Sequence, residues 1–169
     1  MTTYQHWIDG AHVAGESTRT SDVFDPATGR PTKQLTLATR GDVDTAVAAA
    51  QLLPGARAAV EAANARGGSM VISAKHAPNV QLHVDHLGLD VGEVVGDAWR
   101  EQKGEVLRAR AAAMYVGDHE HDMVAARLAG VIGVGVATGG TTADQLREAG
   151  ADVVLASLSE FATALDPLP

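Results

Sequence analysis

The chain has 169 residues, a formal net charge of −8 and no cysteine. This length allows one domain of ordinary size, or a smaller domain with an appendage, and we expect the second arrangement. The acidic balance argues against nucleic acid as a partner, since phosphate contacts need clustered Lys and Arg, and the 13 present here are scattered. Without cysteine there is no disulfide and no thiolate chemistry. No signal peptide and no apolar run of about 18 residues is found, so we expect a cytoplasmic protein without membrane contact.

Residues 1–51 have the pattern of short, one-sided strands followed by a helix. Asp9-Gly10 and residues 25–29 are turn sequences. Asp42 is expected to begin a helix, and the pair Pro54-Gly55 to stop it. Short strands are expected at 6–10, 12–14 and 34–38.

From residue 52 onward, apolar runs of strand length alternate with segments of helical period. This alternation predicts an α/β domain, a three-layer parallel sheet with right-handed crossovers. Aromatic residues are few, so the core should be built from Val, Leu, Ile and Ala. Strands are expected at 69–73, 94–95, 113–116, 131–136 and 152–155, and helices at 56–66, 78–87, 101–112, 120–129, 142–149 and 159–165.

The stretch 114–122, MYVGDHEHD, predicts a strand, a turn and the start of a helix. Asp118 then lies at the carboxyl end of the strand and Asp122 in the first turn of the helix, so both carboxylates can face one point. Two hard oxygen ligands suit Mg²⁺, and open α/β sheets bind ligands at the carboxyl ends of their strands. The alternative is structural: Asp118 caps the helix and Asp122 complements its dipole, each contributing about 1 kcal/mol or less.

Ser73 and Lys103 are two further polar residues on the face that should carry chemistry. Ser73 closes the strand at 69–73, where its hydroxyl can hold a phosphoryl oxygen. Lys103 lies near the start of a helix and can neutralise the same oxygens or the carboxylate pair. The structural alternatives are a local turn for the serine and a solvated lysine. The order Ser, Lys, Gly-Asp-x-x-x-Asp favours a shared site for a small phosphorylated molecule.

This order of motifs resembles the haloacid dehalogenase (HAD) superfamily, particularly its small phosphatase-like members. The resemblance covers about residues 52–169 and includes the connecting pieces at 53–56, 88–89 and 135–139. It implies a HAD-like (Rossmannoid) fold and a Mg²⁺-dependent phosphohydrolase of the phosphoglycolate-phosphatase kind. By this resemblance Ser73 would bind the transferring phosphoryl group and Lys103 would stabilise its charge. Asp118 and Asp122 would hold the metal.

The HAD resemblance lacks one signature. The family's first strand ends in Asp-x-Asp-x-Thr/Val, which supplies the nucleophile and the general acid/base. No expected strand of this chain ends in that motif. The nearest imitation is 23–28, where Asp25 stands in the nucleophile's place and Ala27 in that of the acid. Loss of a nucleophile can cost on the order of 10⁶ in rate, so the sequence predicts an impaired enzyme.

Residues 1–51 resemble instead the beginning of an aldehyde dehydrogenase, of the methylmalonate-semialdehyde type. The likeness is carried by residues 6–10, 24–29 and 42–47. It ends before any catalytic feature of that family, and a chain without cysteine cannot perform its thiol chemistry. The sequence therefore predicts a join between an aldehyde-dehydrogenase-like segment (1–51) and a HAD-like core domain (52–169).

The HAD resemblance also implies a gap in the sheet. The missing strand would lie between the strands that end at Ser73 and at Asp118, and its absence would leave two inner edges unpaired. We expect that residues 1–51 insert a strand, that the two neighbours close up, or that another chain fills the slot. Strands at 21–25 and 34–37 suit the first option poorly, because they alternate as one-sided strands do. A homo-oligomer formed through these edges or through residues 1–51 is a further expectation.

Three functions remain open from the sequence. They are a Mg²⁺-dependent phosphohydrolase, a catalytically silent HAD-like binding module, and an aldehyde-dehydrogenase-like fragment that pairs with other subunits. Two weaker patterns are also present. Paired histidines at 83 and 86 and at 119 and 121 could form a transition-metal site. Residues 133–138 contain a Gly-x-Gly pattern, but its glycines fall within an expected strand, which argues against a dinucleotide loop.

Overall fold

The computed structural model describes residues 2–165 of the chain. Two compact units make up the chain: unit 1 comprises Met1–Gln51 and unit 2 comprises Leu52–Pro169. Each unit has sheets of its own. Over residues 2–165, no helix has both the length and the apolar character needed to cross a membrane.

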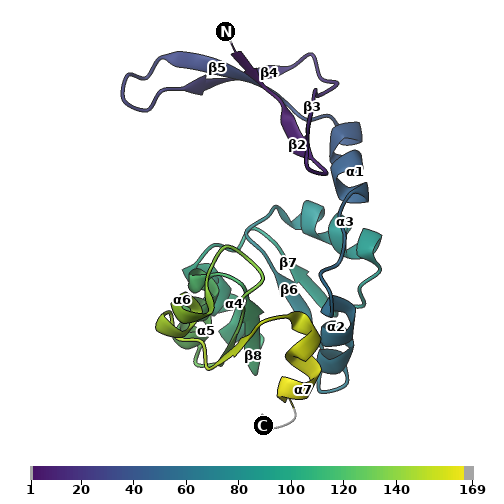
Figure 1. The fold of residues 1–169 in the computed structure, drawn as a ribbon, viewed down its shortest axis with the longest axis vertical. Coiled ribbons are helices and arrows are strands. Elements are labelled where there is room, and N and C mark those ends of the chain that lie inside the picture. Colours follow the sequence, from purple (N-terminus) through teal and green to yellow (C-terminus); the bar gives the residue numbers. More distant parts are fainter. Residues whose placement is uncertain (1, 166–169) are drawn as a thin grey trace. The chain divides into compact units, whose positions relative to one another are not determined.

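Unit 1 is built from short strands and one helix (Figure 1). Strand β1 (Thr2–Tyr4) pairs in parallel with β5 (Pro31–Thr36), and β5 also pairs antiparallel with β4 (Thr20–Phe24). Strands β2 (His6–Ile8) and β3 (Ala11–Val13) form a hairpin. Its turn is made by Asp9 and Gly10, both with positive φ. The predicted hairpin is therefore confirmed, whereas β1 was not predicted.

Helix α1 (Arg40–Ala48) begins with a capping box at Thr39. The Thr39 hydroxyl accepts the N–H of Asp42, and the Asp42 carboxylate accepts the N–H and the hydroxyl of Thr39, both at 2.8 Å. The Thr39 hydrogen bonds lower the pKa of Asp42, because they favour its ionised form. The prediction that Asp42 begins the helix is wrong by three residues, since the cap is Thr39.

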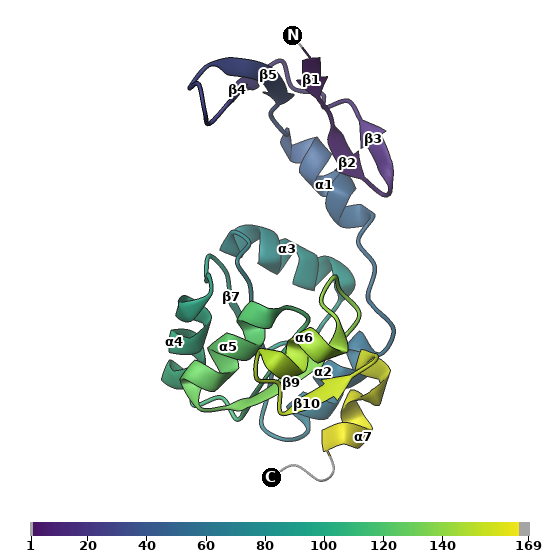
Figure 2. The same cartoon turned by 60° about the vertical axis from the view of Figure 1, so that its left-hand side comes forward.

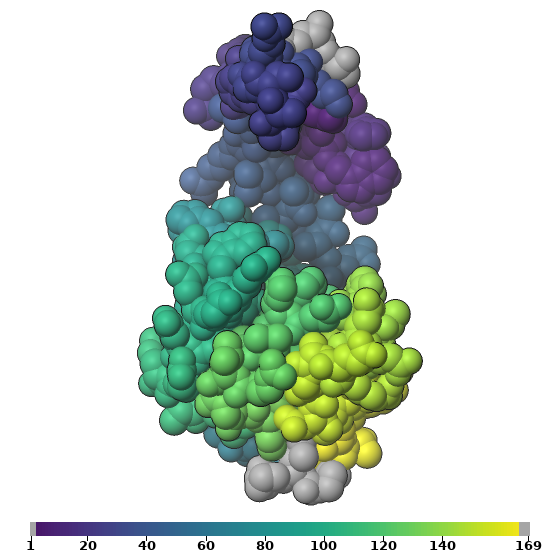
Figure 3. Space-filling view, turned by 90° about the vertical axis from the view of Figure 1, so that its left-hand side faces the viewer, coloured from purple at the N-terminus to yellow at the C-terminus, as the bar shows by residue number. Residues whose placement is uncertain are grey.

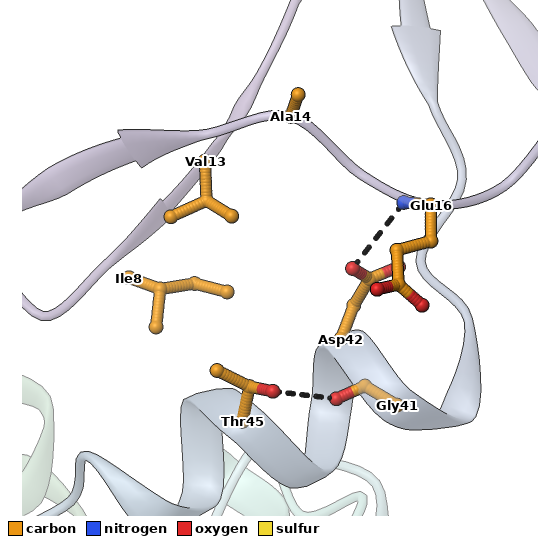
Figure 4. Close-up of a pocket in the computed structure, with 7 residues that line it drawn as sticks. All are labelled: Ile8, Val13, Ala14, Glu16, Gly41, Asp42 and Thr45. Atoms are coloured by element: carbon orange, nitrogen blue, oxygen red, sulfur yellow. Dashed lines mark hydrogen bonds between the residues drawn. The ribbon is translucent and has the colours of Figure 1, made fainter.

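A cavity of about 300 Å³ lies in unit 1, between the β2–β3 hairpin and α1 (Figure 4). The Asp42 carboxylate in its wall is already held by Thr39, and it also accepts the N–H of Glu16 at 3.4 Å. The Thr45 hydroxyl donates to the carbonyl oxygen of Gly41 at 2.9 Å. Most polar groups of this cavity are thus engaged within the chain, and they suggest a structural role.

In unit 2, strands and helices alternate along the chain as predicted (Figure 2). All strand pairs in the described part of this unit are parallel. The strands are β6 (Met70–Ile72), β7 (Glu93–Val95), β8 (Met114–Gly117), β9 (Ile132–Val136) and β10 (Val153–Leu155). The helices are α2 (Ala56–Asn64), α3 (Ala77–Leu87), α4 (Glu101–Ala109), α5 (Glu120–Ala129), α6 (Ala143–Glu148) and α7 (Phe161–Leu165), with a 3₁₀ turn at Leu158–Glu160.

One face of the sheet β8–β9–β10 is covered by α2 and α7, which lie side by side (Figure 1). Alternate strand residues reach this face, as the period of two in a strand requires, and Val134 and Leu155 are the buried ones. They pack with Phe161 and Leu165 of α7. The α2 contribution is three alanines, so its backbone can approach the sheet closely.

The opposite face of this sheet is covered by α5 and α6 (Figure 2). Their outer surface is the green and yellow-green part of Figure 3. Two glycines in β9 make room for these helices. A Cβ at Gly133 would lie 3.4 Å from the Cβ of Ala126, and one at Gly135 would lie 3.1 Å from the Cβ of Leu146. These glycines therefore serve helix packing and not a dinucleotide loop. Helices on both faces complete the three layers.

The parallel strands of unit 2 form two sheets instead of one, β6–β7 and β10–β9–β8. In the described part of the chain, β6 and β8 each lack a hydrogen-bonded strand on one edge, and unit 1 strands pair only with one another. The predictions that residues 1–51 insert a strand, or that β6 and β8 close up, are therefore wrong. Instead, Ile72, Leu107 and Tyr115 meet in one hydrophobic cluster beside both sheets. Filling of the slot by another chain stays a prediction.

Candidate active site

Lys103 and Asp122 form a buried ion pair between α4 and α5. The Lys103 Nζ lies 2.6 Å from Oδ1 of Asp122, and the two side chains are only 16% and 9% exposed. Gly104 permits this approach of the helices, because a Cβ there would lie 3.1 Å from the carbonyl oxygen of Ala125. The alternative of a solvated lysine is therefore wrong.

Tyr115 of β8 donates its hydroxyl hydrogen to the same carboxylate oxygen of Asp122, at 3.1 Å. The Lys103 Nζ also lies 5.8 Å from the centre of the Tyr115 ring. Burial raises the pKa of Tyr115, and the negative charges of Asp122 and Asp118 raise it further. The phenol therefore stays protonated and acts as a donor. The convergence of Asp118 and Asp122 on one point stays a prediction.

The side chains of Asp118 and Asp122 occupy space that a Cβ at either of two glycines would fill. A Cβ at Gly117 would lie 2.5 Å from the Cβ of Asp122, and one at Gly139 would lie 2.4 Å from Oδ2 of Asp118. Asp122 therefore lies over the last residue of β8, and Asp118 lies against the loop that follows β9. Asp118 does not cap α5, since His119 is the capping residue. The structural alternative for Asp118 is thus wrong.

The oxygen atoms of this pair suit a hard cation. Oδ2 of Asp122 has no hydrogen-bond partner among residues 2–165, and Asp118 is exposed. Mg²⁺ is commonly held by one or two carboxylates, with water and substrate oxygens completing its shell. No group of three or more His, Asp or Glu side chains in residues 2–165 could hold a metal by itself. The donor set therefore fits a Mg²⁺ site that is shared with a ligand.

Ser73 follows β6 and is tied to the loop after β7. Its N–H donates to the carbonyl oxygen of Val95, and its own carbonyl oxygen accepts the N–H of Ala98. Its Oγ accepts the N–H of Lys75 at 3.1 Å, which is the local turn expected of a serine at this position. No hydrogen bond in the described structure joins Ser73 to Lys103 or to the carboxylates. Ser73 is connected to Lys103 only indirectly, through its hydrogen bond to Ala98, which precedes the start of α4.

No strand in the described part of the chain ends in an Asp-x-Asp pair. Asp25 lies in the turn after β4, where its Oδ1 accepts the N–H of Ala27 at 2.7 Å. Strand β4 is paired antiparallel, so Asp25 does not stand at the end of a parallel strand. The spacing does occur at Asp42 and Asp44, but these residues lie in α1, where Asp42 serves the cap.

The paired histidines have local partners. Nδ1 of His83 lies 2.7 Å from the carbonyl oxygen of Asn79, one turn earlier in α3. Nδ1 of His119 accepts the N–H of His121. Neither pair belongs to a group of three side chains that could hold a metal among the described residues, so the transition-metal hypothesis has no support there.

Sequence reasoning did not identify Tyr115 or Gly139 as residues of this site. A signal for Tyr115 is present, since the period of two places it on the same face of β8 as Gly117, the face toward α5. For Gly139 the resemblance marks 135–139 as a connecting piece but does not place this glycine against Asp118. Gly139 approaches Asp118 from the loop that follows β9, 21 positions later in the chain.

Residues 85–161 match the model of a protein family described as HAD-hydrolase-like. The matched range contains Lys103, Asp118 and Asp122, and Ser73 lies outside it. A search of curated proteins found no match.

Solved structures of hydrolases share the fold of this chain. One is a haloacid dehalogenase-like hydrolase from Streptococcus pneumoniae, with a TM-score of 0.64 and 16% identity over 74% of this chain and 65% of that chain. A predicted phosphoglycolate phosphatase from Haemophilus somnus has a TM-score of 0.59 and 21% identity over 69% and 58%. A hydrolase from Pseudomonas syringae has a TM-score of 0.58 and 22% identity over 69% and 59%.

The chain thus spans less than two thirds of the length of these three structures. TM-scores of 0.58 to 0.64 establish the shared fold, and at identities of 16% to 22% the likeness extends to the fold alone. These structures confirm the prediction of an α/β, HAD-like (Rossmannoid) arrangement of parallel strands and helices.

Proposed function

We propose that unit 2 binds a small phosphorylated molecule together with Mg²⁺ and hydrolyses its phosphate ester slowly. In this reaction the P–O bond to the leaving alcohol breaks. Water supplies the oxygen that stays on phosphorus, and one of its protons goes to the alcohol. One structural neighbour is named a predicted phosphoglycolate phosphatase, which makes 2-phosphoglycolate a substrate to test.

The buried pair of Lys103 and Asp122 is the observation that carries this proposal. A buried ion pair is a costly way to stabilise a fold, because desolvation offsets much of its attraction. Such a pair beside a second carboxylate, Asp118, at the carboxyl end of a parallel strand favours a binding role. In the proposed site Lys103 neutralises phosphoryl oxygens, and the Ser73 hydroxyl hydrogen is donated to one of them.

Asp118 and the free oxygen of Asp122 would hold Mg²⁺, which supplies positive charge to the phosphoryl oxygens when it is bound. Lys103 and Tyr115 both engage Oδ1 of Asp122. They therefore hold the carboxylate in one orientation with Oδ2 available. Outer contacts of this kind commonly set metal affinity.

Slow turnover follows because no strand in residues 2–165 ends in the Asp-x-Asp pair that would supply a nucleophile. Positioning and charge neutralisation are then what the described site contributes. In a serine protease stripped of its catalytic groups, such contributions leave about 10³–10⁴-fold acceleration over water. We propose an acceleration of that order here.

Hydrolysis of p-nitrophenyl phosphate and of 2-phosphoglycolate, with and without Mg²⁺, tests the proposal. We expect slow turnover that requires Mg²⁺ and is lost in Asp118→Ala. Asp25→Ala should leave the rate unchanged, because that carboxylate is engaged in its own turn; loss of activity would make Asp25 the nucleophile. A parent protein that binds Mg²⁺ and phosphate by calorimetry but shows no turnover would be a silent binding module instead.

Alanine substitutions at two neighbouring glycines, Gly139 and Gly140, distinguish loss of the proposed metal site from loss of the fold. The three atoms nearest to a Cβ at Gly139 all belong to the side chain of Asp118, whose Oδ2 would lie 2.4 Å away. Because this side chain is exposed, Gly139→Ala should displace the carboxylate at little cost in stability. Gly140→Ala is the matched control, because nothing lies within 4 Å of a Cβ there. We expect at least a tenfold weaker Mg²⁺ affinity in Gly139→Ala by calorimetry, about the loss that displacing one ligand contact causes. Equal affinities in both variants would remove Asp118 from the metal site.

A further inference from the structure

The loop between β7 and α4, residues 96–100, carries an exposed tryptophan. Trp99 is 64% exposed, in a chain with only two tryptophans. Its neighbour Ala98 is buried and donates its N–H to the carbonyl oxygen of Ser73. Lys103 follows one helical turn later, and its N–H donates to the carbonyl oxygen of Arg100. The indole thus lies on the short segment that connects the two residues proposed to hold the phosphoryl group.

This loop is held rigidly against the loop that follows β6. Asp97 donates its N–H to the carbonyl oxygen of Lys75 at 2.8 Å, and its carboxylate accepts the N–H of Ala77 at 3.1 Å. The backbones touch at Gly96, where a Cβ would lie 2.3 Å from the Cα of Ala77. The loop that carries the exposed indole is therefore held in place by hydrogen bonds to the loop after β6.

The backbone on both sides of Trp99 is strained. Asp97 has φ of 56° and Arg100 has φ of 39°, although neither is glycine. Such conformations persist only where surrounding contacts enforce them, and they cluster at ligand-binding sites. The N–H of Trp99 is itself fixed by Oε1 of Gln102 at 2.8 Å. The backbone conformations of Asp97 and Arg100 thus cost stability, and they flank a tryptophan ring that is exposed to water.

Charged side chains of both signs lie on the loops around Trp99, and two of the cations have no ion-pair partner within residues 2–165. The side chains of Lys75 and Arg100 have no ion-pair partner in the described residues and are exposed. Lys75 lies on the loop after β6 and Arg100 on the loop after β7, and a backbone hydrogen bond from Asp97 to Lys75 joins these loops. The chain as a whole is acidic. The carboxylate of Asp97 on the loop after β7 is engaged by His76 and by the first N–H of α3. Lys75 and Arg100 are thus two cations without an ion-pair partner in the described part of these loops, and cations near an aromatic ring suit a molecule that has both a phosphate and a ring.

Resting on the proposed function, we propose that Trp99 selects phosphate monoesters whose leaving group carries an aromatic ring. The phosphate lies between Ser73 and Lys103, and the ring of the ester stacks on the indole. Stacking of a ring on an aromatic side chain is removed by substitution with alanine, at a loss of about 5- to 100-fold in affinity. Trp99 is thus a specificity-determining residue, and a ring-free ester gains nothing from it.

The test is equilibrium binding of phenyl phosphate and of glycerol phosphate to the full chain in the presence of Mg²⁺, measured by calorimetry. The variants are Trp99→Ala and Trp99→Leu, the second of which keeps apolar bulk without a ring. Trp7→Ala is the matched control, because Trp7 is also 64% exposed but lies in unit 1 and packs edge-on against His12. Quenching of Trp99 fluorescence in a Trp7→Phe background gives a second readout.

We expect the parent protein and Trp7→Ala to bind phenyl phosphate about tenfold or more tightly than glycerol phosphate. Both Trp99 variants should bind the two esters within about twofold of each other, and phenyl phosphate alone should quench Trp99. Binding of both esters without a ring preference in the parent, or a preference that survives Trp99→Ala, would overturn the inference and leave the proposed function standing. Binding of neither ester, with no hydrolysis of either, would overturn the proposed function and the inference with it.

Discussion

Asp122 is a nearly buried carboxylate whose charge is balanced by one lysine and one phenol. Lys103 and Tyr115 both reach Oδ1, and the side chain of Asp122 is 9% exposed. Removing one partner of a buried pair leaves a charge without compensation, whereas removing one partner of an exposed pair leaves a charge in water. The contribution of Lys103 to stability is therefore much larger than that of an ordinary surface lysine.

Replacement of Lys103 by methionine tests this difference. We expect Lys103→Met to lower the free energy of unfolding by about 3–5 kcal/mol, because Asp122 stays buried without its cation. Urea unfolding, followed by Trp99 fluorescence in a Trp7→Phe background, measures it. Arg110→Ala is the control, because Arg110 pairs with Glu93 at a comparable distance of 2.7 Å but at the surface, and it should change stability far less. Equal effects of the two changes would show that Asp122 is solvated in solution.

At the scale of the element, two threonines in unit 1 have the same hydroxyl but different functions. Thr39 caps α1 and satisfies the N–H of Asp42, which has no partner within the helix. Thr45 lies inside the helix, and its hydroxyl donates to the carbonyl oxygen of Gly41, which already takes part in the helical pattern. Only the cap supplies a hydrogen bond that the helix cannot make alone.

Thr39→Ala should therefore lower the free energy of unfolding of unit 1 by about 1 kcal/mol, as loss of an N-cap typically does. Thr45→Ala should be close to neutral, because it removes a bond that competes with the helix. Trp7 fluorescence in a Trp99→Phe background reports on unit 1 in urea. Indistinguishable midpoints for the two variants would contradict the assignment of Thr39 as the cap.

At the scale of the whole molecule, both units have surfaces that contact with another chain could cover: strand edges of unit 2 that are unpaired among residues 2–165, and exposed apolar side chains in unit 1. In unit 2 the strands β6 and β8 each have one edge without a partner in the described structure. In unit 1 the large apolar side chains of Tyr4, Trp7 and Phe24 are more than 40% exposed. Exposed apolar surface favours association when it is contiguous, and Tyr4 lies beside Leu35 in the β1–β5 pairing.

We propose that the chain associates with itself, mainly through unit 1. Sedimentation of the full chain should show an average mass that rises with concentration. A protein of residues 52–169 should stay monomeric over the same range, because it lacks the exposed apolar side chains of the short strands. Association that persists without residues 1–51 would place the contact at the edges of β6 and β8 instead.

The secondary structure and the local positions of Asp118 and Asp122 are predictable from the sequence because both depend on local patterns. Helical and strand periods repeat within a few residues, so the alternation from residue 52 onward was recognised, and α5 was predicted with the bounds it has. Asp118 and Asp122 are four positions apart on one strand-turn-helix unit. Their positions at the end of β8 and in the first turn of α5 therefore need no information from elsewhere in the chain.

The amino-acid sequence by itself determined the class of fold, the order of its elements and the placing of Asp118 and Asp122 where a strand passes into a helix. Only the tertiary structure decided that unit 2 divides into two sheets, that Lys103 and Tyr115 share one oxygen of Asp122, and that Gly139 lies against Asp118. The physical reason is sequence distance. A strand or helix is specified by neighbours within one or two turns, whereas hydrogen-bond ladders and close contacts join residues 20 or so positions apart, as Lys103 and Asp122 are.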